Sequence, residues 1–189
     1  VSGWMDFGYL RASRVALRDL NIPIVCCLDA QWNNTIKQNI ARLISRAGIL
    51  KFFFTNMWVS GTYQYEYARK LNFSKSEIVF DLYSADLDLF HQAYKENKSK
   101  KIALYPKKFI YVGRFEPVKN INLLLDVWDD IKPFREGWNL TFIGDGSLKG
   151  EIEKVEDVTI KKFLTQPELV EEVKTSGCFV LPSHYEPWG

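Results

Sequence analysis

The chain has 189 residues, of which 47% are hydrophobic and 25% charged, a composition typical of globular rather than disordered proteins. The net charge is only +2, which argues against a nucleic-acid-binding protein, and three cysteines are too few for a disulfide scaffold. No apolar run approaches the roughly 18 residues that a transmembrane helix requires. The sequence begins at Val1 and ends within a loop at Gly189, so we expect an internal piece of a longer protein.

The first half alternates between helical and strand-like patterns. Helical spacing of apolar residues predicts helices over residues 6–20, 33–47 and 62–71. Continuous apolar runs, typical of strands buried on both faces, predict strands over residues 22–28, 50–55 and 78–83. A polar, lysine-rich stretch follows, which predicts a linker over residues 96–107.

The second half repeats the alternation with shorter spacing. Strands are predicted over residues 109–112, 140–143, 158–164 and 178–181, and helices over residues 121–131, 148–155 and 168–174. Alternating strands and helices predict right-handed βαβ units and parallel sheets. The chain is therefore expected to be an α/β protein with two doubly wound, Rossmann-like domains, both incomplete, over residues 1–95 and 108–189.

The loops that follow the second-half strands are the candidate site, because doubly wound sheets bind ligands beyond the carboxyl ends of their strands. Arg114 and Lys119 lie in the first of these loops, just before a predicted helix. Helix N-termini attract anions, and two full positive charges at the same edge add to that attraction. Glu186, in the last loop, supplies a carboxylate that can accept hydrogen bonds from hydroxyls.

Three glycines accompany these charges. Gly113 and Gly144 directly follow predicted strands, and Gly146 comes two residues after Gly144. Glycine allows backbone to approach a phosphate closely, although glycines in such loops also serve ordinary turns. Together with the two cations, they indicate a diphosphate site that needs no metal ion.

Three motifs in this half resemble the donor-binding domain of family 4 glycosyltransferases, which are retaining enzymes of the GT-B fold. They are VGRFEPVKN at residues 112–120, FIGDGSLKGEIE at residues 142–153 and LPSHYEPWG at residues 181–189. The resemblance is looser over residues 1–95, where NFSKSEIVFDLYSADLDLF at residues 72–90 is similar to the stretch before the family's interdomain crossing.

The resemblance implies roles for individual residues. Arg114 and Lys119 are expected to bind the donor diphosphate, in a cleft that Gly113, Gly144 and Gly146 line. Glu186 matches the first of two glutamates that the family places seven residues apart. It is the expected catalytic residue, near the sugar hydroxyls and the reacting carbon, and the second glutamate would fall beyond Gly189.

For four further residues the resemblance implies a location in the site more than a specific role. Phe163 and Leu164 are expected beside the base of the donor, and His184 is expected in the same cleft. Family members often carry a glycine after that strand, where this chain has Thr165. Many members also carry a histidine after the strand corresponding to residues 22–28, where Asp29 is the weak acceptor-side candidate here.

Asp86 and Asp88 form a DxD pair, which in glycosyltransferases of another fold chelates a divalent ion. The alternative is that the pair begins a short helix, with Asp86 as its cap. Because the second reading suits the surrounding sequence better, we expect no metal and no cofactor.

The sequence thus predicts a retaining, hexosyl-type glycosyltransferase that transfers a sugar from a nucleotide diphosphate sugar to a hydroxyl of a glycan or lipid-linked glycan. This piece alone is expected to be inactive. A non-catalytic nucleotide-sugar-binding or partner subunit of the same fold is the alternative. We expect a cytoplasmic location and no nucleic-acid partner.

The first half also admits peripheral contact with an anionic membrane. Residues 1–100 hold 13 basic and 9 acidic residues. The aromatic run at residues 52–54 and Trp58 lie within this basic half. A buried strand followed by a packed tryptophan is the competing explanation, and it is the more common arrangement.

Overall fold

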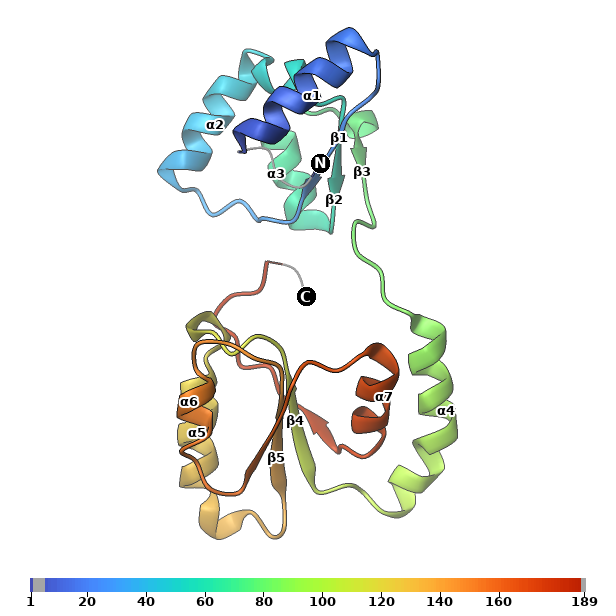
Figure 1. Cartoon of the computed structure of the whole chain (residues 1–189), viewed down its shortest axis with the longest axis vertical. Coiled ribbons are helices and arrows are strands. Elements are labelled where there is room, and N and C mark those ends of the chain that lie inside the picture. Colours follow the sequence, from blue (N-terminus) through green and yellow to red (C-terminus); the bar gives the residue numbers. More distant parts are fainter. Residues whose placement is uncertain (2–5, 188–189) are drawn as a thin grey trace. The chain divides into compact units, whose positions relative to one another are not determined.

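A computed structural model describes Val1 and residues 6–187. The chain divides into two compact units (Figure 1). Unit 1 comprises residues 1–85 together with the C-terminal residues from Pro187 onward, and unit 2 comprises residues 86–186. Each unit is built around its own parallel sheet, as the alternating pattern predicts.

Unit 1 contains a three-stranded parallel sheet in the order β1-β2-β3. Val25 pairs with Asn56, and Met57 pairs with Ile78, so all three strands point the same way. The bounds of its strands and α-helices are α1 (Phe7–Asp19), β1 (Val25–Leu28), α2 (Ile36–Arg46), β2 (Asn56–Val59), α3 (Thr62–Lys70) and β3 (Ile78–Val79).

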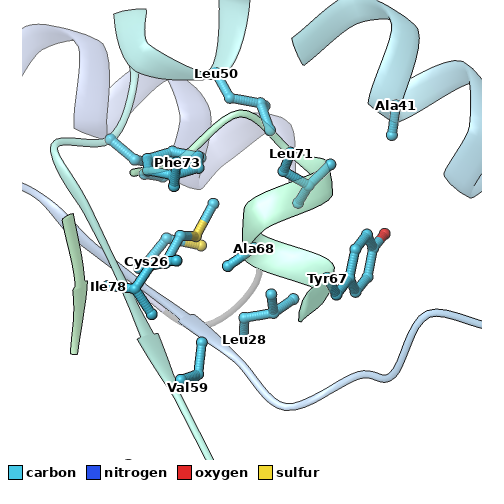
Figure 2. Close-up of a cluster of buried hydrophobic side chains, with 12 residues drawn as sticks. Cys26, Leu28, Ala41, Leu50, Val59, Tyr67, Ala68, Leu71, Phe73 and Ile78 are labelled. Atoms are coloured by element: carbon cyan, nitrogen blue, oxygen red, sulfur yellow. The ribbon is translucent and has the colours of Figure 1, made fainter. Parts of the chain in front are cut away.

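The core of unit 1 lies between its sheet and α3. Figure 2 shows side chains from the sheet meeting those of α3 and the loop after it. Met57, Val59 and Ala68 are fully buried there. Leu71 and Phe73 extend the cluster beyond the end of α3, and this loop is thereby fixed against the sheet.

The strand predicted over residues 50–55 is wrong. Gly48 adopts a left-handed conformation with φ of +77°, and the next residues form a 3₁₀ helix, η1 (Ile49–Phe52). Strand β2 begins only at Asn56. Leu50 and Phe54 are nevertheless buried, because an apolar run reports burial and does not by itself distinguish a strand from a tight helical turn.

The predicted linker over residues 96–107 is also wrong in large part, because residues 96–103 belong to helix α4 (Leu87–Ala103). The boundary between the units lies before this helix. The side chain of Asp86 accepts a hydrogen bond from the N–H of Leu89 at 3.1 Å. Asp86 is therefore a helix cap, as its alternative interpretation predicts, although the helix has 17 residues rather than a few.

Unit 2 contains a four-stranded parallel sheet in the order β6-β5-β4-β7. Helices α5 and α6 cover one face, and α4 and α7 cover the other (Figure 1). The order in which strands are added to the sheet reverses at β4, because β5 and β6 lie on one side of it and β7 lies on the other. The bounds are β4 (Lys108–Val112), α5 (Ile121–Asp130), β5 (Asn139–Ile143), α6 (Lys149–Ile152), β6 (Val158–Lys161), α7 (Gln166–Lys174) and β7 (Cys178–Phe179).

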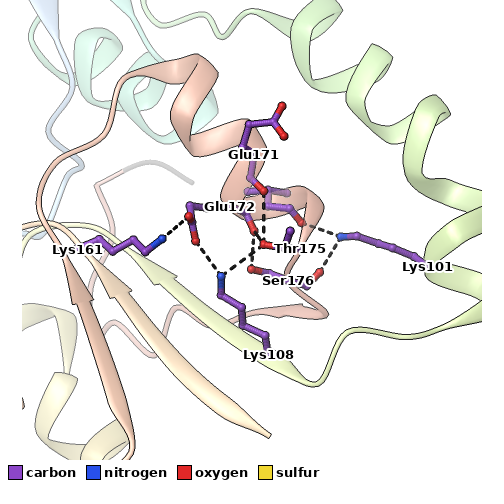
Figure 3. A network of polar contacts seen from close by, with 8 residues as sticks. Lys101, Lys108, Lys161, Glu171, Glu172, Thr175 and Ser176 are labelled. Atoms are coloured by element: carbon purple, nitrogen blue, oxygen red, sulfur yellow. Dashed lines mark hydrogen bonds and ion pairs between the residues drawn. The ribbon is translucent and has the colours of Figure 1, made fainter.

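Lysines anchor α7 in unit 2. Glu172, in its last turn, accepts hydrogen bonds from Lys108 of β4 at 2.8 Å and from Lys161 of β6 (Figure 3). Lys101 of α4 donates to the carbonyl of Ser176 at 2.6 Å, just beyond the helix end. Positive charge near a helix C-terminus is favourable, so these contacts fix α7 relative to the sheet.

Candidate functional site

Three loops of unit 2 converge at the carboxyl edge of its sheet. The N–H of Phe115 donates to the carbonyl of Asp145 at 2.9 Å, which joins the loop after β4 to the loop after β5. The N–H of His184 donates to the carbonyl of Val118 at 3.0 Å, which joins the loop after β7 to the first. Backbone hydrogen bonds therefore join the three predicted site loops to one another. Trp188 and Gly189, at the end of the third motif, lie outside the described residues.

The loops are in close contact because two positions carry no side chain. A Cβ atom on Gly144 would lie 2.0 Å from the carbonyl oxygen of Gly113. A Cβ atom on Gly146 would lie 2.6 Å from the carbonyl oxygen of Phe115. Both glycines also have φ values, +144° and +156°, that L-residues rarely adopt. The glycines are thus required for packing between loops, whatever they do toward a ligand.

A cavity of about 510 Å³ opens beside these loops, within the range typical of small-molecule sites. It lies at the carboxyl ends of β4, β5 and β6 and at the start of α7. It brings together five of the residues that the sequence predicts at the donor site. They are Gly113, Arg114, Gly144, Phe163 and Leu164.

Lys119 and Glu186 do not line this cavity but meet each other beside the same loops. The ammonium group of Lys119 lies 2.6 Å and 2.7 Å from the two carboxylate oxygens of Glu186. Their side chains are only 14% and 27% exposed, so the pair is partly shielded from solvent. The predicted phosphate-binding cation and the predicted catalytic carboxylate are therefore direct partners.

The charge on Glu186 is stabilised by its surroundings. Burial works to raise the pKa of this carboxyl, but hydrogen bonds from Lys119 and Ser183, followed by the positive charges of Lys119 and Arg114, together lower the pKa below its ordinary value. Glu186 is therefore a carboxylate at neutral pH. It can accept hydrogen bonds or face positive charge, but it has no proton to donate.

Tyr111 is a residue of this site that the sequence analysis does not identify. Tyr111 is fully buried, and its hydroxyl donates to the carbonyl of Arg114 at 2.9 Å. This hydrogen bond holds the backbone of the loop after β4 against the core. Burial, together with the negative charge of Glu186, raises the pKa of Tyr111 to about 12. A tyrosine within a strand is usually a core residue, so no sequence signal marks this role.

Thr165 also gains a structural explanation. Its N–H and hydroxyl donate to the carboxylate of Glu168 at 2.8 Å and 2.7 Å, and the pair forms the start of α7. These hydrogen bonds lower the pKa of Glu168. The residue that replaces the family's usual glycine thus begins the helix that forms one wall of the cavity.

Two further predicted residues lie apart from the cavity. The side chain of His184 is exposed, and its backbone N–H donates to the carbonyl of Val118. Asp29 belongs to unit 1, directly after β1, where its carboxylate accepts a hydrogen bond from the hydroxyl of Tyr83 at 3.2 Å. Asp29 thus lies at the carboxyl edge of its own sheet, and its acceptor-side role stays a prediction.

The aromatic residues considered for membrane contact are divided between core and surface. Phe54 is fully buried, whereas Phe52 is 53% exposed. Trp58 is 38% exposed and donates from its indole nitrogen to the carbonyl of Phe80 at 2.8 Å. Among the described residues, no helix combines the length and the hydrophobicity needed to span a bilayer.

Comparison with known proteins agrees with this geometry. Residues 94–189, just over half of the chain, match the model of the family described as Glycosyl transferases group 1. The chain is 29% identical over 103 residues to the amylovoran biosynthesis glycosyltransferase AmsD of Erwinia amylovora. That alignment covers 51% of this chain and 29% of AmsD.

Solved structures match a larger part of the chain. Anabaena Alr3699/HepE in complex with UDP-glucose matches 94% of this chain and 51% of its own, with a TM-score of 0.63 and 14% identity. TarM matches 89% of this chain and 33% of its own, with a TM-score of 0.55 and 19% identity. The chain thus spans about half the length of HepE and less of AmsD and TarM.

These matches confirm the α/β class with two parallel sheets, which corresponds to about half of a GT-B glycosyltransferase structure. They also agree with the three motifs, all of which lie within residues 94–189. The chain belongs to the Glycosyl transferases group 1 family, which is family 4 of the glycosyltransferases.

Proposed function

We propose that this protein transfers a hexosyl group, with retention of configuration, from a nucleoside diphosphate sugar to an acceptor hydroxyl. The observation that carries the proposal is the convergence of three loops of unit 2 beside a cavity of about 510 Å³. Each loop contributes a charged residue of suitable chemistry or a glycine that allows close packing. The two units are proposed to be parts of two Rossmann-like domains, with the donor bound by unit 2.

The donor diphosphate is proposed to lie between Arg114 and Lys119. Cleavage of the glycosidic bond leaves negative charge on the departing diphosphate, and fixed positive groups stabilise that charge as it develops. The ammonium group of Lys119 has three hydrogens, and two of them can donate to the two carboxylate oxygens of Glu186. The third hydrogen can then donate to a phosphate oxygen of the donor. These two cations supply the neutralising charge without a metal ion, so transfer is expected to continue in the presence of EDTA.

Glu186 is proposed to face the sugar. As a carboxylate it can accept hydrogen bonds from sugar hydroxyls and stabilise the positive charge that grows on the reacting carbon. Its contact with Lys119 supports this role, because the sugar of the donor is bonded directly to the diphosphate that Lys119 is proposed to bind. This role requires the ionised form, which the lowered pKa of Glu186 provides.

The base is proposed to bind against Phe163 and Leu164. Phe163 is 87% exposed while lining the cavity, and an exposed aromatic ring is a stacking surface for a base. HepE is described in complex with UDP and with UDP-glucose, so uridine nucleotides are the first donors to test. The acceptor is proposed to be a glycan or a lipid-linked glycan, bound by unit 1.

Titration calorimetry without added metal tests the donor site. We expect UDP to bind more tightly than GDP or ADP, and the Arg114→Gln, Lys119→Gln double variant to lose this binding. Lys132→Gln, which removes an exposed lysine of the same unit, should leave it unchanged. If UDP, GDP and ADP all fail to bind the folded protein, the donor-site proposal is wrong.

Release of UDP from UDP-glucose in the presence of candidate acceptors tests transfer. Loss of one charged contact of this kind typically lowers turnover by about 10²–10³-fold. Glu186→Gln should retain UDP binding and lose turnover. Wild-type binding of UDP without release from any donor sugar would instead support a non-catalytic nucleotide-sugar-binding protein.

A further inference from the structure

A single segment between β6 and α7 forms one wall of the cavity of about 510 Å³. We call residues 162–169 the base wall, since the proposed function places the base of the donor against Phe163 and Leu164. Phe163 is 87% exposed, so packing in the core of unit 2 does not fix its position. The base wall contributes five residues to the cavity lining, which are Phe163, Leu164, Thr165, Gln166 and Leu169.

An ion pair joins the two ends of the base wall. The ammonium group of Lys161, at the end of β6, donates to the carboxylate of Glu172 in the last turn of α7 (Figure 3). The two residues are 11 positions apart in the sequence, so the pair closes the base wall into a loop. Closing a loop removes conformations that the residues within it could otherwise adopt. The side chains of Lys161 and Glu172 are 38% and 17% exposed, so salt screens this pair less than a fully exposed one.

The backbone of Lys161 connects the base wall to the loops that carry the charged residues. Its carbonyl accepts a hydrogen bond from the N–H of Gly144 at 3.0 Å. Gly144 in turn packs against the backbone of Gly113, where an added Cβ atom would lie 2.0 Å from the carbonyl oxygen. The start of the base wall is therefore held by the donor loops, and its far end is held by Glu172.

Lys108 forms a second hydrogen bond to Glu172 that lies outside this closed loop. Its ammonium group, which comes from β4, lies 2.8 Å from the other carboxylate oxygen (Figure 3). Hydrogen bonds from Lys108 and Lys161 lower the pKa of Glu172 below its ordinary value. The carboxylate is therefore ionised at neutral pH and serves both lysines. Lys108 anchors α7 to the sheet, whereas Lys161 alone closes the base wall.

We propose that Lys161 and Glu172 are positioning residues for the nucleotide base, because their ion pair holds the base wall in its receiving conformation before the donor arrives. This inference rests on the proposed function and adds residues beyond the donor contacts. Neither Lys161 nor Glu172 is among the described residues that line the cavity, so the pair acts through Phe163 and Leu164. Without the pair, donor binding must order the base wall, and that ordering lowers the affinity.

Titration calorimetry with two ligands tests the proposal, because UDP contains a base and inorganic pyrophosphate does not. Glu172→Gln should bind UDP about tenfold more weakly, the factor expected when binding must order roughly one or two mobile side chains. Its affinity for pyrophosphate should stay close to that of the parent, since Arg114 and Lys119 are unaltered. Lys161→Gln should show the same difference between the ligands, and Lys161→Arg, which can keep the ion pair, should bind UDP as the parent does.

The matched control is Lys108→Gln, which removes the other partner of Glu172 and leaves the base wall closed. It should lower the melting temperature, as Lys161→Gln should, yet bind UDP with the affinity of the parent. Hydrogen exchange without ligand gives a second comparison. Exchange over residues 162–165 should be faster in Lys161→Gln than in Lys108→Gln, because only the first variant opens the loop.

Three results would overturn the proposal. The first is unchanged UDP affinity in both Glu172→Gln and Lys161→Gln. The second is an equal loss of affinity for UDP and pyrophosphate, since the pair would then act on the whole site. The third is the same loss of UDP affinity in Lys108→Gln, which general anchoring of α7 would explain. A parent that binds no UDP would instead contradict the proposed donor site itself, and this inference with it, so the two failures are distinguishable.

Discussion

Replacing Gly144 with alanine tests whether the convergence of the loops depends on backbone contact. The new methyl group would lie 2.0 Å from the carbonyl oxygen of Gly113 and 3.2 Å from the ring of Phe115. Real Cβ atoms essentially never come within 3.0 Å of another heavy atom. The substitution therefore requires one of the two loops to move.

Neither loop can move without losing hydrogen bonds. The N–H of Gly113 donates to the carbonyl of Ile143 at 3.0 Å, and the N–H of Gly144 donates to the carbonyl of Lys161 at 3.0 Å. The φ of +144° adds strain for any L-residue. Backbone strain contributes about 1–3 kcal/mol, and a weakened hydrogen bond about 1 kcal/mol. We expect Gly144→Ala to lower the free energy of unfolding by about 3 kcal/mol.

Urea unfolding followed by circular dichroism measures this loss. The matched control is Gly137→Ala in the same unit, where φ is +83° but no atom lies within 4 Å of the new methyl group. Only the left-handed conformation penalises the control, by about 1 kcal/mol. Equal losses of stability in the two variants would refute the argument from loop contact, because conformation alone would then explain both.

Three further outcomes are expected. Lys51 and the backbone of Ser74 hold the pKa of Glu77 at about 2, below its usual 4.5. The stability that this carboxylate contributes should therefore be complete above pH 4.5 and be lost as the pH falls toward 2, by about 1 kcal/mol after solvent screening. Thermal unfolding at stepped pH should show this loss in the parent and a flatter profile in Glu77→Gln. Arg135→Ala should cost about 2 kcal/mol in urea unfolding, because its guanidinium lies 4.0 Å from the centre of the Trp128 ring and donates to that residue's carbonyl; full rescue by Arg135→Lys would contradict the role of its planar shape. Glu172→Gln should lower the melting temperature and increase hydrogen exchange in α7, because two lysines lose their charged partner; unchanged exchange would show that they do not anchor this helix.

Much of unit 2 could be predicted from sequence because its elements end at clear signals. The apolar strand that ends at Gly113 and the one that ends at Gly144 are β4 and β5 in the structure. The helix after Asn120 is α5. In such segments periodicity, turn residues and burial all indicate the same element, and prediction from pattern is then reliable.

The two wrong elements of the sequence analysis fail for different reasons. Residues 96–103 look like a linker because lysines dominate, yet lysine and glutamate are good helix formers. Within α4, all of which the structure describes, Ala93 is the one buried residue, so the sequence carries no wide apolar stripe that would indicate a helix. Residues 50–55 are apolar because they are buried, and the left-handed turn at Gly48 instead directs them into a 3₁₀ helix.

The candidate site shows the same division. Its loops could be predicted because parallel strands bring their carboxyl ends to one edge. The pairing of Lys119 with Glu186 could not, because 67 residues separate them and no local pattern specifies a long-range contact. The support that Tyr111 gives to Arg114 depends on which side of β4 the tyrosine occupies, and strand alternation alone does not assign a role to that side.

Hydrogen–deuterium exchange with and without UDP tests the central claim most directly, because it locates the bound nucleotide along the chain. The account predicts slower exchange over residues 112–119, 143–147 and 163–169, with the amides of unit 2 outside these loops largely unchanged. Protection confined to other segments, while calorimetry confirms that UDP is bound, would contradict a donor site at the carboxyl edge of this sheet.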